Sequence, residues 1–180
     1  MKTSTTSVAL AGALLLLLSA SAQSAISNPS QSDVETTAKT HMTAFFRGDI
    51  RTASNYMHPD TLSALRAALL RDLDNAIAAG KEGELLAQMN LKQNAQTLRS
   101  LSPKEPYVVL VESDHRKNEK AFRAMEGTIV TVVNSTFLQS GEAIVRLTIT
   151  TPTPSGTKTQ DGSLLLAKAD GEWKVKGNSQ

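Results

Sequence analysis

The chain of 180 residues contains no cysteine. Disulfide bonds, thiol catalysis and zinc sites made of cysteine thiolates are therefore excluded. The hydrophobic fraction of 40% allows a core that holds without such links, and the length fits one domain. Lysine and arginine never form a run of five or more and the formal net charge is only +2, so the sequence indicates no nucleic-acid partner.

Common catalytic signatures are missing as well. The sequence has no Gly-x-Ser-x-Gly elbow, no phosphate loop and no dinucleotide fingerprint. Its three histidines show neither His-x-His nor His-x-x-x-His spacing, which leaves too few ligands for a metal site. The sequence therefore predicts neither a metal nor another cofactor.

The N-terminus is typical of a secretory signal peptide. Lys2 supplies the positive charge, residues 8–18 form an apolar run, and Ala-Ser-Ala at 20–22 fits the cleavage rule. The run is too short to span a membrane and no stop-transfer charges follow it, so no span is expected in the mature chain. We predict a signal peptide over residues 1–22, a flexible leader over 23–31 and a periplasmic or secreted protein. The alternative is an uncleaved anchor or a buried helix.

Helical patterns fill the middle of the chain. Ser32 and Glu35 form a capping box for a first helix, whose apolar stripe ends just before Gly48. Pro59 fits the first turn of a long third helix. Further helices are expected over residues 50–57, over 81–101 as one broken or two short helices, over 107–111 after a second capping box at 102–105, and over 119–125. A strand over 107–111 is the alternative, because this segment is rich in β-branched residues.

The last third of the chain predicts an antiparallel sheet. Apolar and polar side chains alternate in residues 142–151 and 172–176, as in strands with one buried and one wet face. Asp170-Gly171 is the strongest hairpin signal in the sequence. The expected strands cover residues 128–138, 142–151, 159–168 and 172–176, with a longer loop over 152–156. Helices that precede an antiparallel sheet define an α+β fold, here a single domain over residues 32–177.

The order of these elements resembles the nuclear transport factor 2-like superfamily. Phe-Phe-Arg-Gly-Asp at 45–49, followed by a short helix with Tyr56, is similar to the superfamily's opening. The hairpin over 162–175 resembles its last two strands, and the additional helices resemble small secreted members of unknown role. The resemblance implies a cone, in which N-terminal helices pack on a curved C-terminal antiparallel sheet with a pocket between them. Members use that pocket as enzymes, as binding modules or not at all, so the fold alone does not choose a function.

Within this resemblance, His41 is the first candidate residue. It lies at the edge of the apolar stripe, seven residues before Gly48, where the ketosteroid isomerases of the superfamily place an oxyanion-stabilising tyrosine. A histidine there could donate a hydrogen bond into the pocket or shuttle a proton. The alternative is a half-exposed histidine at the helix boundary. The base of an isomerase would fall near Ala64, with Asp60 out of register, so a catalytic acid pair is not supported.

The predicted ligand pocket is lined by His41, Phe45, Tyr56 and Trp173. Trp173 is expected mainly as a core residue of the last strand, with a ligand platform as the alternative. His58 is expected in the cap region of the third helix. Residues 114–117, Asp-His-Arg-Lys, predict a solvated turn between helices or a small anion site.

These features predict a non-enzymatic exported module that binds a small apolar ligand or a protein partner through the pocket or the sheet. A homodimer through the outer sheet face is a further expectation, with contacts from Thr148, Thr150, Lys174 and Lys176. The alternatives are an isomerase-like or polyketide cyclase-like enzyme that uses His41, and a structural role without any pocket.

Overall fold

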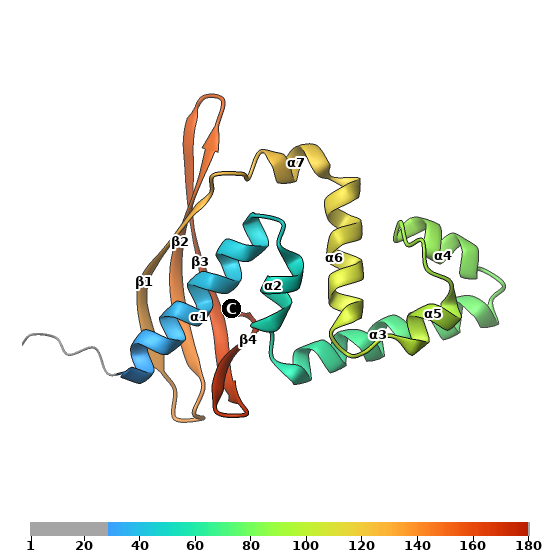
Figure 1. Ribbon diagram of the computed structural model, residues 1–180, viewed down its shortest axis with the longest axis horizontal. Coiled ribbons are helices and arrows are strands. Elements are labelled where there is room, and N and C mark those ends of the chain that lie inside the picture. Colours follow the sequence, from blue (N-terminus) through green and yellow to red (C-terminus); the bar gives the residue numbers. More distant parts are fainter. Residues whose placement is uncertain (1–28, 180) are drawn as a thin grey trace, which may run out of the picture.

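The computed structural model describes residues 29–179, in which helices come first and a sheet follows (Figure 1). The helices are α1 (Pro29–Phe46), α2 (Ile50–Asn55), α3 (Pro59–Ala78), α4 (Glu82–Gln88), α5 (Ala95–Ser100), α6 (Glu105–Lys117) and α7 (Glu119–Arg123). The strands are β1 (Ile129–Phe137), β2 (Ala143–Thr153), β3 (Gly156–Ala169) and β4 (Glu172–Asn178). The predicted α+β class is confirmed.

The four strands form an antiparallel sheet in the order β1-β2-β3-β4, and each strand pairs with the next along the chain. Asp170 and Gly171 both have positive φ angles, 51° and 82°, as a two-residue hairpin turn between β3 and β4 requires. The loop predicted over residues 152–156 is wrong. β2 and β3 stay paired as far as Thr153 and Gly156, and their hairpin projects beyond the rest of the sheet (Figure 1).

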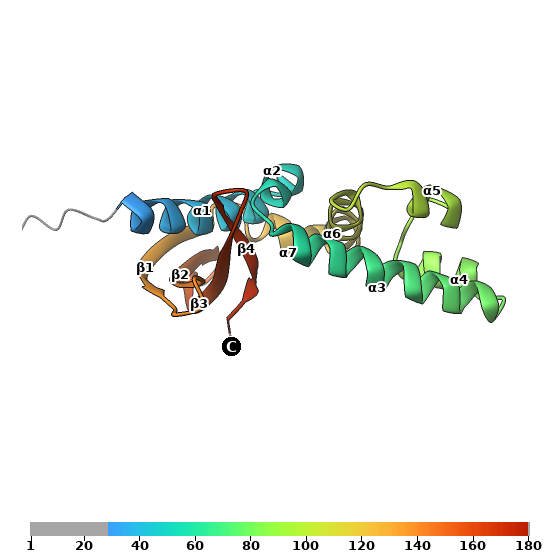
Figure 2. The same ribbon diagram turned by 90° about the horizontal axis from the view of Figure 1, so that it is seen from below.

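The sheet curls around α1, and the main hydrophobic core lies between them (Figure 2). Val34 and Ala38 of α1 are fully buried against the sheet because they recur on one helix face. The strands contribute Val130, Ala143, Val145, Leu147, Leu164, Leu166, Trp173 and Val175. The alternation predicted for β2 is confirmed, since Val145 and Leu147 are buried while Arg146 between them is exposed.

A second hydrophobic core belongs to the helices alone. It contains Leu73, Leu91, Ala95, Leu98 and Val109, with further leucines and Met89 packed around them. Its helices α3, α4 and α5 extend away from the sheet as an arm, against which α6 packs (Figures 1 and 2). We call the α1–sheet unit the cone and the α3–α6 unit the arm. The single domain predicted over residues 32–177 stays a prediction.

The two edges of the sheet differ. The edge of β4 is covered by the segment between α2 and α3, because His58 N donates to the Val175 carbonyl over 2.8 Å and Val175 N donates to the Tyr56 carbonyl over 2.7 Å. β1 forms the other edge, and its register with β2 shifts between Val132 and Asn134. Such a bulge increases the local twist of an edge strand.

Both predicted capping boxes are wrong. α1 begins at Pro29, so Ser32 lies inside the helix, and Glu35 instead accepts hydrogen bonds from Gln31 and from Ser135 of β1. α6 begins at Glu105 with no side-chain cap, but it does include residues 107–111 as helix. A capping box needs an extended N-cap residue, whereas the N-cap residue of α6, Lys104, has helical backbone angles.

Helix ends set by glycine or proline follow the sequence more closely. α1 stops before Gly48, which has a φ angle of 73°, and α3 begins at Pro59. Residues 81–101 form two short helices, as one of the two expected forms. The predicted signal peptide over 1–22 lies outside the described residues, as does most of the predicted leader, whose last residues 29–31 belong to α1. Among residues 29–179, none of the helices has the length and apolar character needed to cross a membrane.

Candidate functional site

His41 is buried, with only 6% of its surface exposed, which excludes the half-exposed alternative. Its Nδ1 atom lies 3.0 Å from the carbonyl oxygen of Ala53 in α2. A carbonyl oxygen can only accept a hydrogen bond, so Nδ1 carries the hydrogen. In the neutral ring Nε2 is then an acceptor with a free lone pair.

Burial also sets the protonation state of this histidine. Desolvation lowers the pKa of His41 below its ordinary value, and the hydrogen bond to Ala53 opposes this shift as the smaller influence. The imidazole is therefore neutral at neutral pH. Its Nε2 atom can accept a hydrogen bond from a ligand or take up a proton, but the ring is not a cation that attracts anions.

A cavity of about 340 Å³ lies next to His41, between α1, α6 and the end of the sheet. It is lined by His41, Met42, Phe45, Met57, Tyr107, Leu164, Val175, Gly177 and Asn178. We call this space the His41 cavity. Most of its lining is apolar, and its side-chain polar groups are one imidazole, one phenol and one amide. This combination is common in sites for small molecules, where apolar walls provide affinity and a few polar groups fix orientation.

The sequence analysis missed seven of the nine lining residues, and Tyr107 is the one of them with a partly buried polar group. It lies in the first turn of α6, next to the buried residues Pro106 and Val108. Burial raises the pKa of Tyr107, so its phenol stays protonated and can donate a hydrogen bond. The only available signal was a tyrosine in a segment that is helical rather than extended, and nothing local placed that segment beside His41.

The structure brings together two of the four predicted pocket residues and separates the other two. His41 and Phe45 line the His41 cavity, whereas Tyr56 and Trp173 line a different cleft of about 370 Å³ beside the β3–β4 hairpin. Only 7% of the Trp173 surface is exposed. The centre of its ring lies 5.8 Å from that of Phe137, and the Lys168 ammonium lies 5.4 Å from the ring centre. Its main role is thus in the core, as the sequence favoured.

The other two histidines have structural surroundings. His58 is the N-cap of α3, and its ring accepts a hydrogen bond from Asp60 N over 3.2 Å. His115 stacks on Phe122 of α7, with ring centres 3.4 Å apart. Residues 114–117 form the last turn of α6, so the predicted solvated turn is wrong. The stacking of His115 on Phe122 joins α6 to α7 at the point where a turn was expected.

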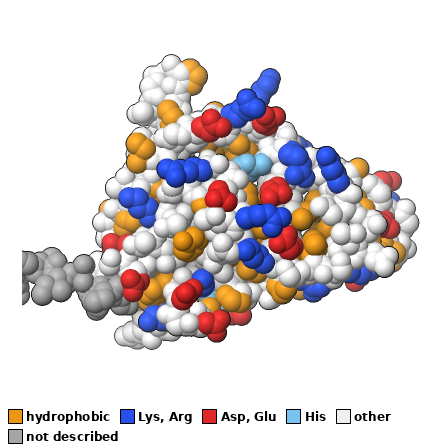
Figure 3. All heavy atoms as spheres, viewed as in Figure 1, with side chains coloured by type: hydrophobic (Ala, Val, Ile, Leu, Met, Phe, Trp, Pro, Cys, Tyr) orange, Lys and Arg blue, Asp and Glu red, His pale blue; other side chains and the backbone are white. Residues whose placement is uncertain are grey.

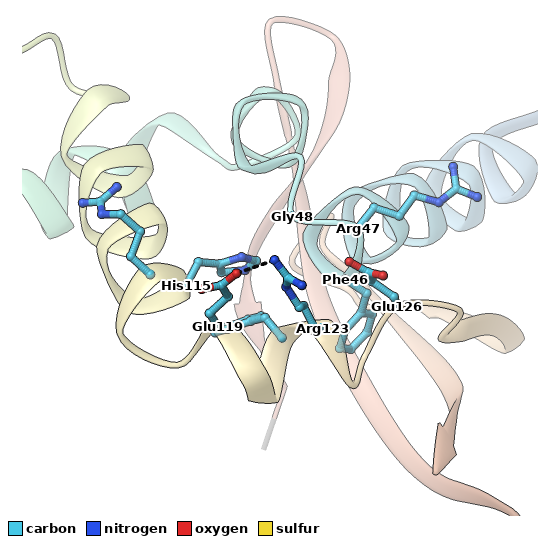
Figure 4. A pocket seen from close by; sticks show the side chains of 9 residues that line it. Phe46, Arg47, Gly48, His115, Glu119, Arg123 and Glu126 are labelled. Atoms are coloured by element: carbon cyan, nitrogen blue, oxygen red, sulfur yellow. Dashed lines mark ion pairs between the residues drawn. The ribbon is translucent and has the colours of Figure 1, made fainter. Parts of the chain in front are cut away.

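A cleft of about 400 Å³ lies beside His115 and holds charges of both signs (Figure 4). Arg123 is paired with Glu119 over 2.6 Å, and the Arg47 guanidinium points away from that pair (Figure 4). The lining holds three arginines, Arg47, Arg116 and Arg123, and the carboxylates of Glu119 and Glu126 offset most of their positive charge. Within the described part of the chain, no group of three or more His, Asp or Glu is placed to hold a metal ion.

No known family model and no curated protein match the sequence. A solved structure with a similar fold is an NTF-2-like protein of unknown function from Shewanella oneidensis MR-1. It shares 16% sequence identity, with 82% of this chain and 94% of that chain covered and a TM-score of 0.45. The function of that protein is unknown.

Proposed function

We propose that this protein is a non-enzymatic module that binds a small apolar ligand in the His41 cavity. The observation that carries the proposal is an apolar space between α1, α6 and the sheet, with a neutral histidine and a protonated tyrosine in its wall. A volume of about 340 Å³ falls within the range typical of small-molecule sites. Binding of such a ligand is favourable because it removes apolar surface of both the ligand and the protein from water.

A cavity-filling variant tests the proposal. Met42→Trp places a larger side chain in the lining, whereas Ile77→Trp adds the same side chain at an exposed position of α3. We expect the uncharged dye Nile red to bind the wild type and the Ile77 variant with similar affinity and the Met42 variant at least about tenfold more weakly, as loss of roughly 1.4 kcal/mol implies. Equal binding by all three proteins would refute the proposal. Mass spectrometry of the purified protein would reveal any retained ligand.

A second candidate function is proton transfer by His41, as in an isomerase-like or cyclase-like enzyme. It is supported by the free lone pair on Nε2 and by the bond to Ala53 that orients the ring. The cavity lining contains no carboxylate, and Asp60 and Ala64 lie outside it on α3, so Tyr107 would have to stabilise the developing charge. Incubation of an apolar unsaturated ketone in deuterated water tests this role. Deuterium uptake that His41→Phe does not reduce, or no uptake at all, would exclude it.

We also propose that a second copy of the chain docks on the free edge of the sheet. Among residues 29–179, four large hydrophobic side chains are exposed, and Ile129, Val133 and Phe137 of β1 are three of them. β1 contains no charged residue, so two copies of this edge would meet without charge repulsion. Light scattering at high concentration tests the dimer, and Val133→Lys should convert it to a monomer. A wild type that is monomeric at every concentration would refute this pairing.

The lysines first expected in a dimer contact have partners within the chain. Lys174 donates to the Asn55 carbonyl and to Glu172, and Lys176 donates to Glu142. The proposed contact is therefore centred on β1. On the face shown in Figure 3, basic and acidic side chains are interspersed, without a continuous basic area.

We further propose that the protein is exported. Cell fractionation tests this proposal, with the intact protein compared with a variant in which Lys2 and Leu14 are substituted.

A further inference from the structure

The side chains that line the His41 cavity favour ligands that are uncharged as well as apolar. No Asp, Glu, Lys or Arg belongs to its lining, and its histidine is neutral. A ligand carboxylate or ammonium would leave water without an opposite charge in the lining to receive it, which is unfavourable. Charged ligands, fatty-acid anions among them, are therefore disfavoured.

The hydrogen-bonding groups of the cavity lining restrict the class of ligand further. The Ala53 carbonyl fixes the ring of His41 so that Nε2 is an acceptor, which needs a donor from the ligand. Tyr107 contributes a phenol from the neighbouring helix. It is protonated and can donate. Asn178 is the third polar residue of the lining, but it is exposed and its amide can bond to water.

We infer that the His41 cavity takes an uncharged apolar molecule that carries a hydroxyl group, with the hydroxyl donating to His41 Nε2 and accepting from the Tyr107 phenol. A hydroxyl satisfies both groups, whereas an ether or a ketone can only accept and leaves the imidazole lone pair without a partner. The inference rests on the proposed binding function and specifies its ligand class.

Three naphthalene derivatives of similar size test the inference by isothermal titration calorimetry at pH 7. 2-Naphthol offers the donor, 2-methoxynaphthalene only an acceptor, and 2-naphthoate a negative charge. We expect 2-naphthol to bind about tenfold more tightly than 2-methoxynaphthalene, the upper range for one hydrogen bond to a neutral partner. 2-Naphthoate should bind more weakly than both.

Two variants distinguish the contributions of His41 and Tyr107 to ligand binding. His41→Phe removes the acceptor, so the preference for 2-naphthol over 2-methoxynaphthalene should disappear. Tyr107→Phe removes the donor, so both compounds should bind several-fold more weakly while the preference remains. Because His41→Phe also loses the bond to Ala53, thermal unfolding checks its fold, and the wild-type series together with Tyr107→Phe keeps the inference testable if that variant does not fold.

The outcomes distinguish this inference from the proposed function. If the compounds bind in a manner that Met42→Trp abolishes but 2-naphthoate or 2-methoxynaphthalene binds at least as well as 2-naphthol, the ligand class is wrong and the binding function stands. If none of them binds, or if Met42→Trp has no effect on their binding, both are overturned.

Discussion

The cone and the arm bury comparable kinds of side chain in different ways. The cone core joins residues from opposite ends of the described chain, such as Val34 and Trp173. The arm core joins residues within one continuous segment, from Leu73 to Val109. The His41 cavity lies at the border of the cone core, where α1 and the end of the sheet meet α6.

In addition to its hydrophobic core, the arm has side-chain hydrogen bonds that link its helices. Ser113 of α6 donates to the carbonyls of Met89 and Asn90 and so holds the turn after α4. Arg66 of α3 donates to the carbonyls of Arg99 and Leu101 after α5. These bonds occupy backbone acceptors at helix ends that would otherwise lack partners. Within the arm, α6 packs on α3, and α6 carries Tyr107 into the cavity wall.

The largest expected effect is on the cone. Trp173→Ala removes a buried aromatic side chain and should lower the free energy of unfolding by about 3–5 kcal/mol, as measured by urea denaturation. Total stabilities are roughly 5–15 kcal/mol, so the variant should be poorly folded.

Lys174→Ala is its neighbour control. The alternation in residues 172–176 predicts that Lys174 faces water, and substitutions at such positions usually change stability little. The structure corrects this, since the side chain is only 20% exposed and bonds to Asn55 and Glu172. A loss of about 1 kcal/mol is therefore expected. Equal effects of the two changes would contradict the assignment of alternate faces in β4.

Leu98→Ala tests whether the arm can unfold without the cone. Leu98 is fully buried in the arm core, and its truncation should cost about 2–5 kcal/mol locally. Trp173 is the only tryptophan, so its fluorescence reports on the cone. We expect helical circular dichroism to decrease at lower urea concentration than the fluorescence change, because the two cores share few contacts. Coincident transitions in this variant would show that cone and arm unfold as one unit.

A smaller effect should appear as a pH dependence of the cone. The pKa of His41 is lower in the folded protein than its ordinary value of 6.5, so the unfolded chain binds a proton more readily. Stability is therefore complete above pH 6.5 and is lost as the pH falls below it, with a slope of at most about 1.4 kcal/mol per pH unit for one proton.

His41→Gln should flatten this slope in urea titrations between pH 7.5 and 5.5, a window set by the ordinary pKa of about 6.5. Burial also lowers the pKa of His115, so His115→Gln is the matched control for the second contribution. A slope that neither variant changes would mean that neither histidine is responsible.

The smallest effect is expected at the surface of the arm. Arg99 and Asp74 form an ion pair of 2.5 Å, but 48% and 61% of their side chains are exposed. Exposed pairs contribute about 0–1 kcal/mol, because water screens the attraction and both side chains lose freedom. Asp74→Ala should thus shift the urea midpoint only slightly, and less at high salt. A loss as large as that of Leu98→Ala would show that this pair is needed to close the arm.

The sequence alone predicted the class of fold and most element positions. These predictions succeeded because they depend on interactions between residues close together in the sequence. Alternation in β2 and β4, the Asp170-Gly171 turn and the stop at Gly48 each depend on backbone preferences or on burial of one face. His41 was singled out by its offset from Gly48, which depends on the resemblance to the superfamily, and by its place at the edge of the apolar stripe of the first helix.

Tertiary structure decided everything that depends on which segments meet. It placed Tyr107 beside His41 and separated Tyr56 and Trp173 from both. It also gave Lys174 a partner in α2, on a face expected to be wet. Periodicity states which face of an element is buried but not what buries it. The lining of a cavity between distant segments is therefore determined by packing in three dimensions.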